Sequence, residues 1–358
     1  MPIRVLIVDD SRFFCKRIKD TLEEERSFQV VGTATNGRQA VAMAASTNPD
    51  VITMDVEMPI MDGITAVKEI MSTSPTPILM FSASTHAGAK ATFDALEAGA
   101  VDFLPKQLEE IDENRETAKS LLRRRVKTVA MQAVRIKQKH TATKNRIQET
   151  QQKNNVIKLH PSVRPSCNNP HFDLVTIIAS TGGPVAIQKL IAKIPENFLP
   201  PVILIQHMPG NFTSSFAERL DESCPIQVKE ASDGDLLKSG LMLLAPGGKQ
   251  ILLERRRGHN KVMLREKIAG EIYSPSADVT LSSIAENFNG NVLVLVLTGM
   301  GADGKNGAAH LKRKGATIWT QNEASCIVYG MPKAVSEAGL ADEVMSLEVM
   351  SEKLAGMH

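Results

Sequence analysis

Cysteines, aromatic residues and long hydrophobic runs are all scarce in this sequence. Its 358 residues include four cysteines, and no two of them form a Cys-x-x-Cys pair. This argues against a zinc site or a disulfide framework and fits a reducing cytoplasm. Aromatic residues make up 4% of the chain, so the cores must consist largely of aliphatic side chains and methionine.

Membrane and export signals are also missing. The longest apolar run, Val292–Leu297, is long enough for a strand but not for a membrane span. The first ten residues do not combine a basic region with an apolar stretch and a cleavage site, as a signal peptide would. We therefore expect a cytoplasmic protein that does not insert into a membrane.

The net charge of +2 hides an uneven distribution of basic residues. Between Lys119 and Lys158 there are twelve lysines and arginines and one acidic residue, Glu149. Such a stretch either attracts acidic partners or, as we favour, is a solvated linker extended by its own repulsion. Its second half is also rich in Gln and Asn, a composition that cannot build a core.

The length and the pattern of apolar runs predict two α/β domains joined by this linker. We place the first domain at residues 1–125, the linker at 126–170 and the second domain at 171–358. In the first domain, apolar runs alternate with helical patterns, which predicts a five-fold βα unit with a doubly wound parallel sheet. In the second domain, the pattern of apolar runs predicts an α/β fold with a largely parallel sheet and a β-rich middle. Predicted strands are Arg4–Val8, Gln29–Thr33, Val51–Met54, Pro77–Phe81 and Val101–Leu104, then Asp173–Ala179, Val202–Gln206, Gly240–Ala245, Gln250–Glu254, Lys261–Arg265, Val292–Thr298 and Thr317–Gln321.

Carboxylates gather at strand ends in the first domain. Asp9 and Asp10 end the first strand and Asp55 ends the third, and the carboxyl ends of strands in such a sheet line one crevice. Mutually repelling carboxylates with only oxygen ligands favour Mg²⁺. Ser82 and Lys106 follow the fourth and fifth strands. An aspartate beside a metal ion and a lysine is suited to accept a phosphoryl group, although a single acidic pair would more simply cap a helix.

These residues carry a family resemblance. Val-Asp-Asp-Ser, Met-Asp-Val-Glu-Met-Pro-Ile-Met-Asp-Gly, Phe-Ser-Ala-Ser and Asp-Phe-Leu-Pro-Lys resemble the motifs of response-regulator receiver domains. The resemblance implies that Asp55 accepts the phosphoryl group and that a histidine kinase donates it. It also implies roles for further residues: Asp9, Asp10, Asp55 and the carbonyl of Val56 as Mg²⁺ ligands, Ser82 and Lys106 as phosphate contacts, and Phe103 as the aromatic residue that reorients.

In the second domain, a serine, a histidine and an aspartate each follow a predicted strand. Ser180 precedes Thr-Gly-Gly-Pro, His207 lies in Gln-His-Met-Pro, and Asp303 lies in Leu-Thr-Gly-Met-Gly-Ala-Asp-Gly. Alone, Ser180 would be a helix cap or a phosphate-loop residue, and a single histidine is usually structural. Together the three side chains supply the nucleophile, base and orienting acid of acyl transfer.

A different function fits part of the same region. The segment 299–304 also matches the dinucleotide fingerprint Gly-x-Gly-x-x-Gly, and Glu323 lies near the distance expected for a ribose ligand. Against this, the motif comes late in the chain, and Asp303 would face a pyrophosphate of like charge. The hydrolase interpretation is therefore favoured.

The second half as a whole resembles the catalytic domain of chemotaxis protein-glutamate methylesterases. The matching stretches include Ala-Ser-Thr-Gly-Gly-Pro, Gln-His-Met-Pro, Ser-Pro-Ser-Ala-Asp, Leu-Thr-Gly-Met-Gly-Ala-Asp-Gly and Glu-Ala-Ser-Cys-Ile-Val-Tyr-Gly-Met-Pro-Lys-Ala. The resemblance implies that Ser180 is the nucleophile, His207 the base and Asp303 its partner. It also implies that the amides of Thr181 and Met300 form the oxyanion hole.

The two resemblances imply a phosphorylation-activated hydrolase that removes methyl esters from glutamates of chemotaxis receptors. Deamidation of receptor glutamines is an expected second activity, and the ester chemistry itself requires no cofactor. Two alternatives are a receiver joined to a non-catalytic docking module and a DNA-binding response regulator. The intact Ser, His and Asp argue against the first. The absence of a terminal helix-turn-helix pattern argues against the second, so we expect no nucleic-acid partner.

Overall fold

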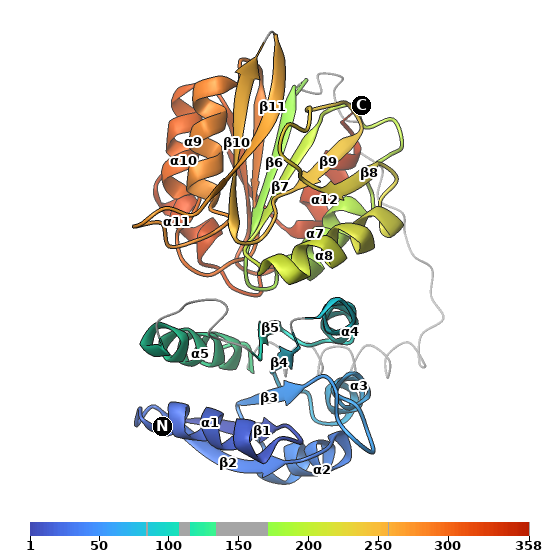
Figure 1. Cartoon of the computed structure of the whole chain (residues 1–358), viewed down its shortest axis with the longest axis vertical. Coiled ribbons are helices and arrows are strands. Elements are labelled where there is room, and N and C mark those ends of the chain that lie inside the picture. The colour runs from blue at the N-terminus through green and yellow to red at the C-terminus, as the bar shows by residue number, and fades with distance from the viewer. Residues whose placement is uncertain (84, 107–114, 134–170, 257, 358) are drawn as a thin grey trace, which may run out of the picture. The chain divides into compact units, whose positions relative to one another are not determined.

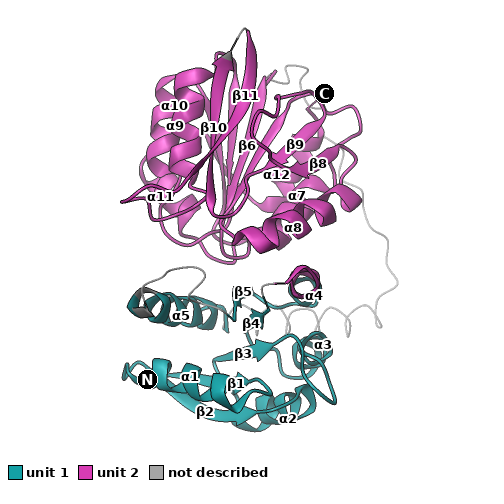
Figure 2. Ribbon diagram, viewed as in Figure 1, with its two compact units in different colours: residues 1–83, 94–169 teal, residues 84–93, 170–358 magenta. Residues whose placement is uncertain are grey.

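The computed structural model describes residues 1–83, 85–106, 115–133, 171–256 and 258–357, shown in Figure 1. It divides into two compact units, residues 1–83 with 94–169 and residues 84–93 with 170–358, which are coloured separately in Figure 2. No helix within the described ranges is long and apolar enough to cross a bilayer.

The N-terminal fold is the predicted five-fold βα unit. Its sheet has the order β2-β1-β3-β4-β5, and every paired strand runs parallel to its neighbour. The strands β3 and β4 are buried along their whole length, which explains their uninterrupted apolar sequence. The strands are β1 (Ile3–Val8), β2 (Phe28–Ala34), β3 (Val51–Asp55), β4 (Ile78–Ser82) and β5 (Asp102–Pro105).

The helices of this fold begin at polar residues that cap them. Ser11, Asn36 and Asp62 each accept a hydrogen bond from a backbone amide in the first turn of the helix that follows, a standard helix start. Among the described residues of this fold, the helices are α1 (Arg12–Glu23), α2 (Gly37–Thr47), α3 (Gly63–Thr73), α4 (His86–Glu97) and α5 (Arg115–Ala130).

Helix α5 continues past residue 125, where the sequence placed the end of the first domain. Val126 and Val129 lie in its last turns and are fully buried, so this part of the basic stretch is amphipathic helix and not solvated linker. The remainder of the expected linker, 134–170, lies outside the described residues.

The C-terminal unit is built on a seven-stranded sheet with the order β14-β13-β12-β6-β7-β9-β8. All its strand pairs are parallel, which confirms the predicted fold class. Figure 1 shows helices on both faces of this sheet. The strands are β6 (Leu174–Ala179), β7 (Val202–Gln206), β8 (Gln227–Glu230), β9 (Leu241–Leu244), β12 (Val292–Val296), β13 (Thr317–Gln321) and β14 (Glu343–Met345), and the helices are α7 (Gly183–Ile191), α8 (Gly210–Ser223), α9 (Ala277–Asn287), α10 (Lys305–Arg313), α11 (Met331–Glu337) and α12 (Leu347–Ala355).

The β-rich middle of the sequence divides between two structures. The predicted strand Gly240–Ala245 joins the parallel sheet as β9, whereas β10 (Lys249–Arg256) and β11 (His259–Glu266) form a separate antiparallel hairpin. The hairpin contributes Ile251, Leu253 and Val262 to a buried core shared with α9 and α10. It therefore supports helices α9 and α10.

The central strand β6 lies between β12 and β7. The strands that come next in the chain, β7 to β9, lie on one side of β6, and the later strands, β12 to β14, lie on the other side. Ile178 pairs with Val296, and Ala179 pairs with Gln206. Strands β6, β7 and β12 thus end at one rim, at the place where ligands bind in open α/β sheets.

Candidate functional site

In the N-terminal unit, the predicted carboxylates converge. One ligand oxygen from each of Asp9, Asp10 and Asp55 lies within 4.8 Å of the other two. The ammonium group of Lys106 is 2.6 Å from Asp55 Oδ2 and 3.0 Å from Asp9 Oδ2. The carboxyl ends of β1, β3 and β5 therefore bring together groups that lie far apart in the sequence.

Burial and neighbouring charges change the ionisation of this cluster. Burial raises the pKa of Asp55 to about 6, against the lowering effect of the Lys106 hydrogen bond, and the charge of Asp9 raises it further. Burial would lower the pKa of Lys106, but its hydrogen bonds to Asp55 and Asp9 hold the pKa above its ordinary value. Within the described ranges, Lys106 is the cation that contacts these carboxylates. Three carboxylates beside one ammonium group carry excess negative charge that a metal cation would balance.

The donors at this site fit a divalent cation such as Mg²⁺. A cavity of about 540 Å³ is lined by Asp10, Asp55, Val56, Ser82 and Lys106, among others. The carboxylate groups that line it offer hard oxygen atoms as ligands, which Mg²⁺ prefers. The carbonyl of Val56 accepts a hydrogen bond from Gly63 at 2.9 Å, and a carbonyl oxygen retains a second lone pair for a metal. Phe103, the predicted switch residue, is buried in β5.

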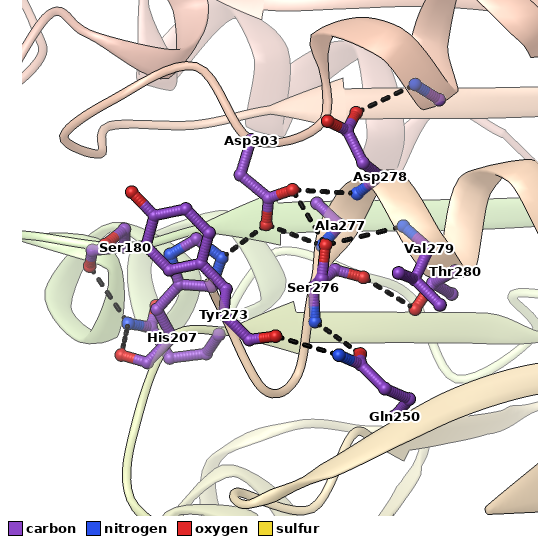
Figure 3. Close-up of polar contacts among 12 residues, drawn as sticks. Ser180, His207, Gln250, Tyr273, Ser276, Ala277, Asp278, Val279, Thr280 and Asp303 are labelled. Atoms are coloured by element: carbon purple, nitrogen blue, oxygen red, sulfur yellow. Dashed lines mark hydrogen bonds and ion pairs between the residues drawn. The ribbon is translucent and has the colours of Figure 1, made fainter. Parts of the chain in front are cut away.

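In the C-terminal unit, Ser180, His207 and Asp303 gather at the rim where β6, β7 and β12 end. Ser180 N donates to Thr298 O at 3.1 Å, and His207 N donates to Ala179 O at 3.1 Å. His207 Nε2 is 2.7 Å from Asp303 Oδ2. All three residues come from separate loops, and Figure 3 shows the ring of His207 directed at Asp303.

Asp303 is held by the beginning of helix α9. Its Oδ1 accepts hydrogen bonds from Ser276 Oγ at 2.9 Å and Asp278 N at 3.0 Å, and its Oδ2 accepts one from Ala277 N at 2.7 Å. Burial would raise the pKa of Asp303, but the hydrogen bond and charge of His207 and these amides hold it below its usual value. Asp303 therefore stays ionised beside the histidine.

The orientation of His207 follows from this contact. Because Nε2 faces Asp303, the other ring nitrogen, Nδ1, is the one available as a base. Nδ1 is buried and has no hydrogen-bond partner among the described residues, and in Figure 3 it lies on the Ser180 side of the ring. A buried nitrogen without a partner is costly in a purely structural histidine, so this arrangement favours a functional role.

The loops beside Ser180 include both predicted oxyanion residues. Thr181 is buried and directly precedes the glycine turn into α7. Met300 follows Gly299, where an added Cβ would lie 2.9 Å from Ser180 Cβ. The segments that contain the two amides thus both lie next to Ser180, at the start of a helix where backbone N–H groups suit a negative charge.

The same loop was the basis of the dinucleotide alternative. Gly301 and Gly304 adopt φ values of 88° and 95°, a region that favours glycine. Asp303 between them binds His207 and the α9 amides. The glycines therefore permit a tight turn that directs Asp303 at His207. This geometry favours the hydrolase interpretation over dinucleotide binding.

Several supporting residues were not predicted from the sequence. Gln206 Nε2 donates to the carbonyls of Ser180 (2.9 Å) and His207 (3.2 Å), which joins the two catalytic loops. Ser276 contacts Asp303, and the ring of Tyr273 stacks on His207. The available signal was Ser-Pro-Ser-Ala-Asp, whose Ser276 and Asp278 are typical of a helix start.

Comparisons with known proteins find matches for both units. Residues 175–354 match the family model described as CheB methylesterase, and residues 5–118 match the model described as response regulator receiver domain. A relative from Vibrio parahaemolyticus, named protein-glutamate methylesterase/protein-glutamine glutaminase, is 47% identical, covering 99% of this chain and 98% of its own length. A relative from Pseudomonas putida with the same activities in its name is 47% identical and covers 99% of both chains.

A solved structure supports the C-terminal match. The Thermotoga maritima CheB methylesterase catalytic domain aligns with a TM-score of 0.50 and 38% identity, covering 52% of this chain and 98% of that chain. The likeness therefore extends to the arrangement of strands and helices around the candidate site.

Proposed function

This chain belongs to the CheB methylesterase family, and we propose that it removes methyl esters from glutamates of chemotaxis receptors under the control of receiver phosphorylation. The observation that carries the hydrolase is the buried contact between His207 Nε2 and Asp303 Oδ2, beside Ser180 and with Nδ1 unpartnered among the described residues. The family relationship supplies the substrate class.

The proposed reaction is acyl transfer through Ser180. Its Oγ attacks the ester carbonyl while His207 Nδ1 takes the proton, and Asp303 stabilises the imidazolium that forms. The amides of Thr181 and Met300 hold the oxyanion. The tetrahedral intermediate expels methanol, which receives the proton from His207. His207 then takes a proton from a water molecule as this water attacks the acyl-enzyme. The second tetrahedral intermediate breaks its bond to Ser180 Oγ, which receives the proton from His207, and the free carboxylate is released.

Deamidation of glutamine follows the same route with ammonia as the leaving group. The curated relatives carry glutaminase in their names, and the same acyl-enzyme forms from a glutamine side chain. Because ammonia is a poorer leaving group than methanol, we expect the ester to react faster.

In the receiver, Asp55 accepts the phosphoryl group from a chemotaxis histidine kinase. Asp9, Asp10, Asp55 and the carbonyl of Val56 would hold Mg²⁺, whose charge supplies electrostatic stabilisation during transfer. Lys106 and Ser82 contact the transferred phosphate, and Phe103 reorients in response. The new charge biases an equilibrium between two conformations, which is how phosphorylation acts in general.

We place the receiver domain at about residues 1–130, because Val126 and Val129 are buried in α5, and the hydrolase domain at 171–358. We propose that the protein is cytoplasmic and acts at membrane-bound receptors, and that it binds no nucleic acid.

Methanol release from receptor membranes carrying labelled methyl groups tests this function. We expect release by the wild type, stimulation by a small phosphodonor with Mg²⁺, and no release by Ser180→Ala. A well-folded wild type that releases no methanol from methylated receptors would contradict the proposal, as would one that instead binds NAD by calorimetry. A docking module without activity would bind the receptor membranes but leave their methyl groups in place.

A further inference from the structure

The ring of Tyr273 lies flat against the imidazole of His207. The two ring centroids are 4.4 Å apart and the ring planes differ by 5°, as Figure 3 shows. Tyr273 belongs to the segment between β11 and α9, far from His207 in the sequence. Aromatic side chains at this separation attract one another beyond the effect of buried area.

The side chain of Gln250 holds the backbone of Tyr273 in place and also binds Ser276. The carbonyl of Tyr273 accepts a hydrogen bond from Gln250 Nε2 at 2.8 Å, and Oε1 of the same glutamine accepts one from Ser276 N, also at 2.8 Å. Gln250 is fully buried on the hairpin strand β10. One carboxamide therefore fixes both the residue that stacks on His207 and the residue that hydrogen bonds to Asp303.

The other end of Tyr273 reaches the loop that contains Asp303. A Cβ added to Gly301 would lie 2.9 Å from Tyr273 Oη. The backbone of Tyr273 thus binds Gln250 on β10, its ring stacks on His207, and its hydroxyl group lies close to Gly301 in the loop that contains Asp303.

A hydrogen bond at one nitrogen does not fix an imidazole ring. His207 has the Nε2 contact to Asp303, while Nδ1 has no hydrogen-bond partner within the described part of the chain. The ring could therefore tilt about the axis of this bond and move Nδ1 away from Ser180. A flat aromatic surface at stacking distance restricts that tilt.

We propose that Tyr273 is a positioning residue for the proposed hydrolase, and that its ring keeps His207 Nδ1 directed at Ser180. The stacking is stronger once the histidine becomes an imidazolium, because the face of an aromatic ring attracts a cation. The benefit therefore increases as the proton is transferred, and it appears in kcat more than in KM. The aromatic ring carries this role, and the hydroxyl is dispensable.

Two substitutions separate the ring from the hydroxyl. Tyr273→Phe keeps the ring and should retain wild-type kcat within about twofold. Tyr273→Leu keeps an apolar side chain without a ring, and its kcat for methyl-ester hydrolysis should fall roughly 3- to 10-fold with KM unchanged, as expected for the loss of one stacking contact. Ile272→Ala, an exposed neighbour in the same segment, is the matched control and should behave as wild type.

NMR of histidine-labelled protein provides a readout that does not depend on the substrate. The ring protons of His207 should shift upfield in the wild type and in Tyr273→Phe, because they lie over an aromatic face. The downfield Nε2–H proton in the bond to Asp303 should be sharp in both and broadened in Tyr273→Leu. The unfolding temperature of each variant shows whether it is folded.

Three results would overturn the proposal: a sharp Nε2–H signal with normal kcat in folded Tyr273→Leu, an equal loss of kcat in Tyr273→Phe, or a change confined to KM, which would make Tyr273 a substrate contact. The proposed function fails separately, if wild type and Ser180→Ala release the same amount of methanol. The NMR comparison still tests the positioning role in that case.

Discussion

Asp303→Asn is the substitution that most directly tests the catalytic geometry. It preserves the size of the side chain but replaces one oxygen by an NH₂ group. The two oxygens of Asp303 together accept four hydrogen bonds, two at Oδ1 from Ser276 Oγ and Asp278 N and two at Oδ2 from Ala277 N and His207 Nε2. Both oxygens accept from donors, so the asparagine places its NH₂ group next to hydrogen-bond donors whether that group occupies the Oδ1 or the Oδ2 position.

Each orientation has an identifiable cost. With NH₂ at the Oδ2 position, it faces Ala277 N–H, and His207 must present a lone pair at Nε2, which leaves the proton on Nδ1 where the base is needed. With NH₂ at the Oδ1 position, the histidine keeps its tautomer, but Asp278 N–H faces a donor. In both cases the charge that stabilises the imidazolium is lost.

The magnitude follows from these contacts. Losing a charge-assisted hydrogen bond costs about 1.5–3 kcal/mol, and leaving a buried amide donor unpaired costs about 1–3 kcal/mol. The unpaired amide costs folding stability equally in the ground state and the transition state, so it does not lower turnover. Turnover falls because the tautomer is wrong or the charge beside the imidazolium is missing, and the same change in a known triad costs about 10⁴ in kcat, which corresponds to about 5 kcal/mol.

The assay is methanol release from methylated receptor membranes, with kcat and KM measured separately. Asp221→Asn is a suitable control, because Asp221 also accepts a backbone hydrogen bond, from Val228 N at 2.7 Å, and asparagine can still accept it. A folded Asp303→Asn protein with wild-type turnover would refute the assignment of Asp303 as the partner of the base. Improved NAD binding by this variant would revive the dinucleotide alternative.

Three further substitutions address the nucleophile, the phosphorylation site and the hairpin. Ser180→Ala should fold normally and lose ester hydrolysis by several orders of magnitude; normal turnover would remove Ser180 as nucleophile. Asp55→Asn should keep basal hydrolysis but lose stimulation by phosphodonor and Mg²⁺, and equal stimulation of both proteins would show that the acceptor lies elsewhere. The paired Arg265 guanidinium lowers the pKa of Glu271 to about 2. A depressed carboxyl pKa stabilises the fold above the unfolded value near 4.5 and loses that contribution as pH falls towards 2. Glu271→Gln should therefore be less stable than wild type at pH 7 by roughly 1 kcal/mol after screening, with the difference vanishing near pH 2 in thermal unfolding; a constant difference would refute the ion-pair origin.

The arrangement of the two sites could be predicted from the sequence because parallel sheets place strand ends together. Asp9 follows β1 and Asp55 ends β3, while Ser180 and His207 follow β6 and β7. The runs of buried Val, Ile and Leu that mark these strands are visible in the sequence. Once the strands are recognised, the residues directly after them belong to one rim.

The supporting residues could not be predicted in this way, because they contact the site across long sequence separations and belong to no periodic pattern. Gln250 is an ordinary strand residue by sequence, yet its side chain fixes Tyr273 and Ser276. Tyr273 lies in an irregular segment whose path depends on the hairpin. The short strands β8 and β14 were missed for a related reason: at four and three residues they give little alternation to detect.

Helix α5 continues to Ala130, five residues past the predicted end of the first domain. The stretch from Lys119 contains many basic residues, but Leu122, Val126 and Val129 recur at helical spacing and are buried, whereas Arg125 pairs with Asp102 at 2.7 Å. Periodicity was the better guide there than composition.

Asp303 owes its orientation to two helix ends rather than to its own glycine-rich loop. Asp303 precedes α10 and binds the amides that begin α9, while Asp278 in the first turn of α9 accepts a hydrogen bond from Gly307 N in α10 at 2.8 Å. Each helix thus supplies a carboxylate to the positive end of the other. These two hydrogen-bonding contacts require helices α9 and α10 to approach closely. A glycine at position 307 permits this, because a Cβ there would lie 2.6 Å from Leu281 Cβ. Because the two helices pack through buried Ala277, Leu281 and Ala308, a loop that contains flexible glycines can still present Asp303 in one orientation to His207.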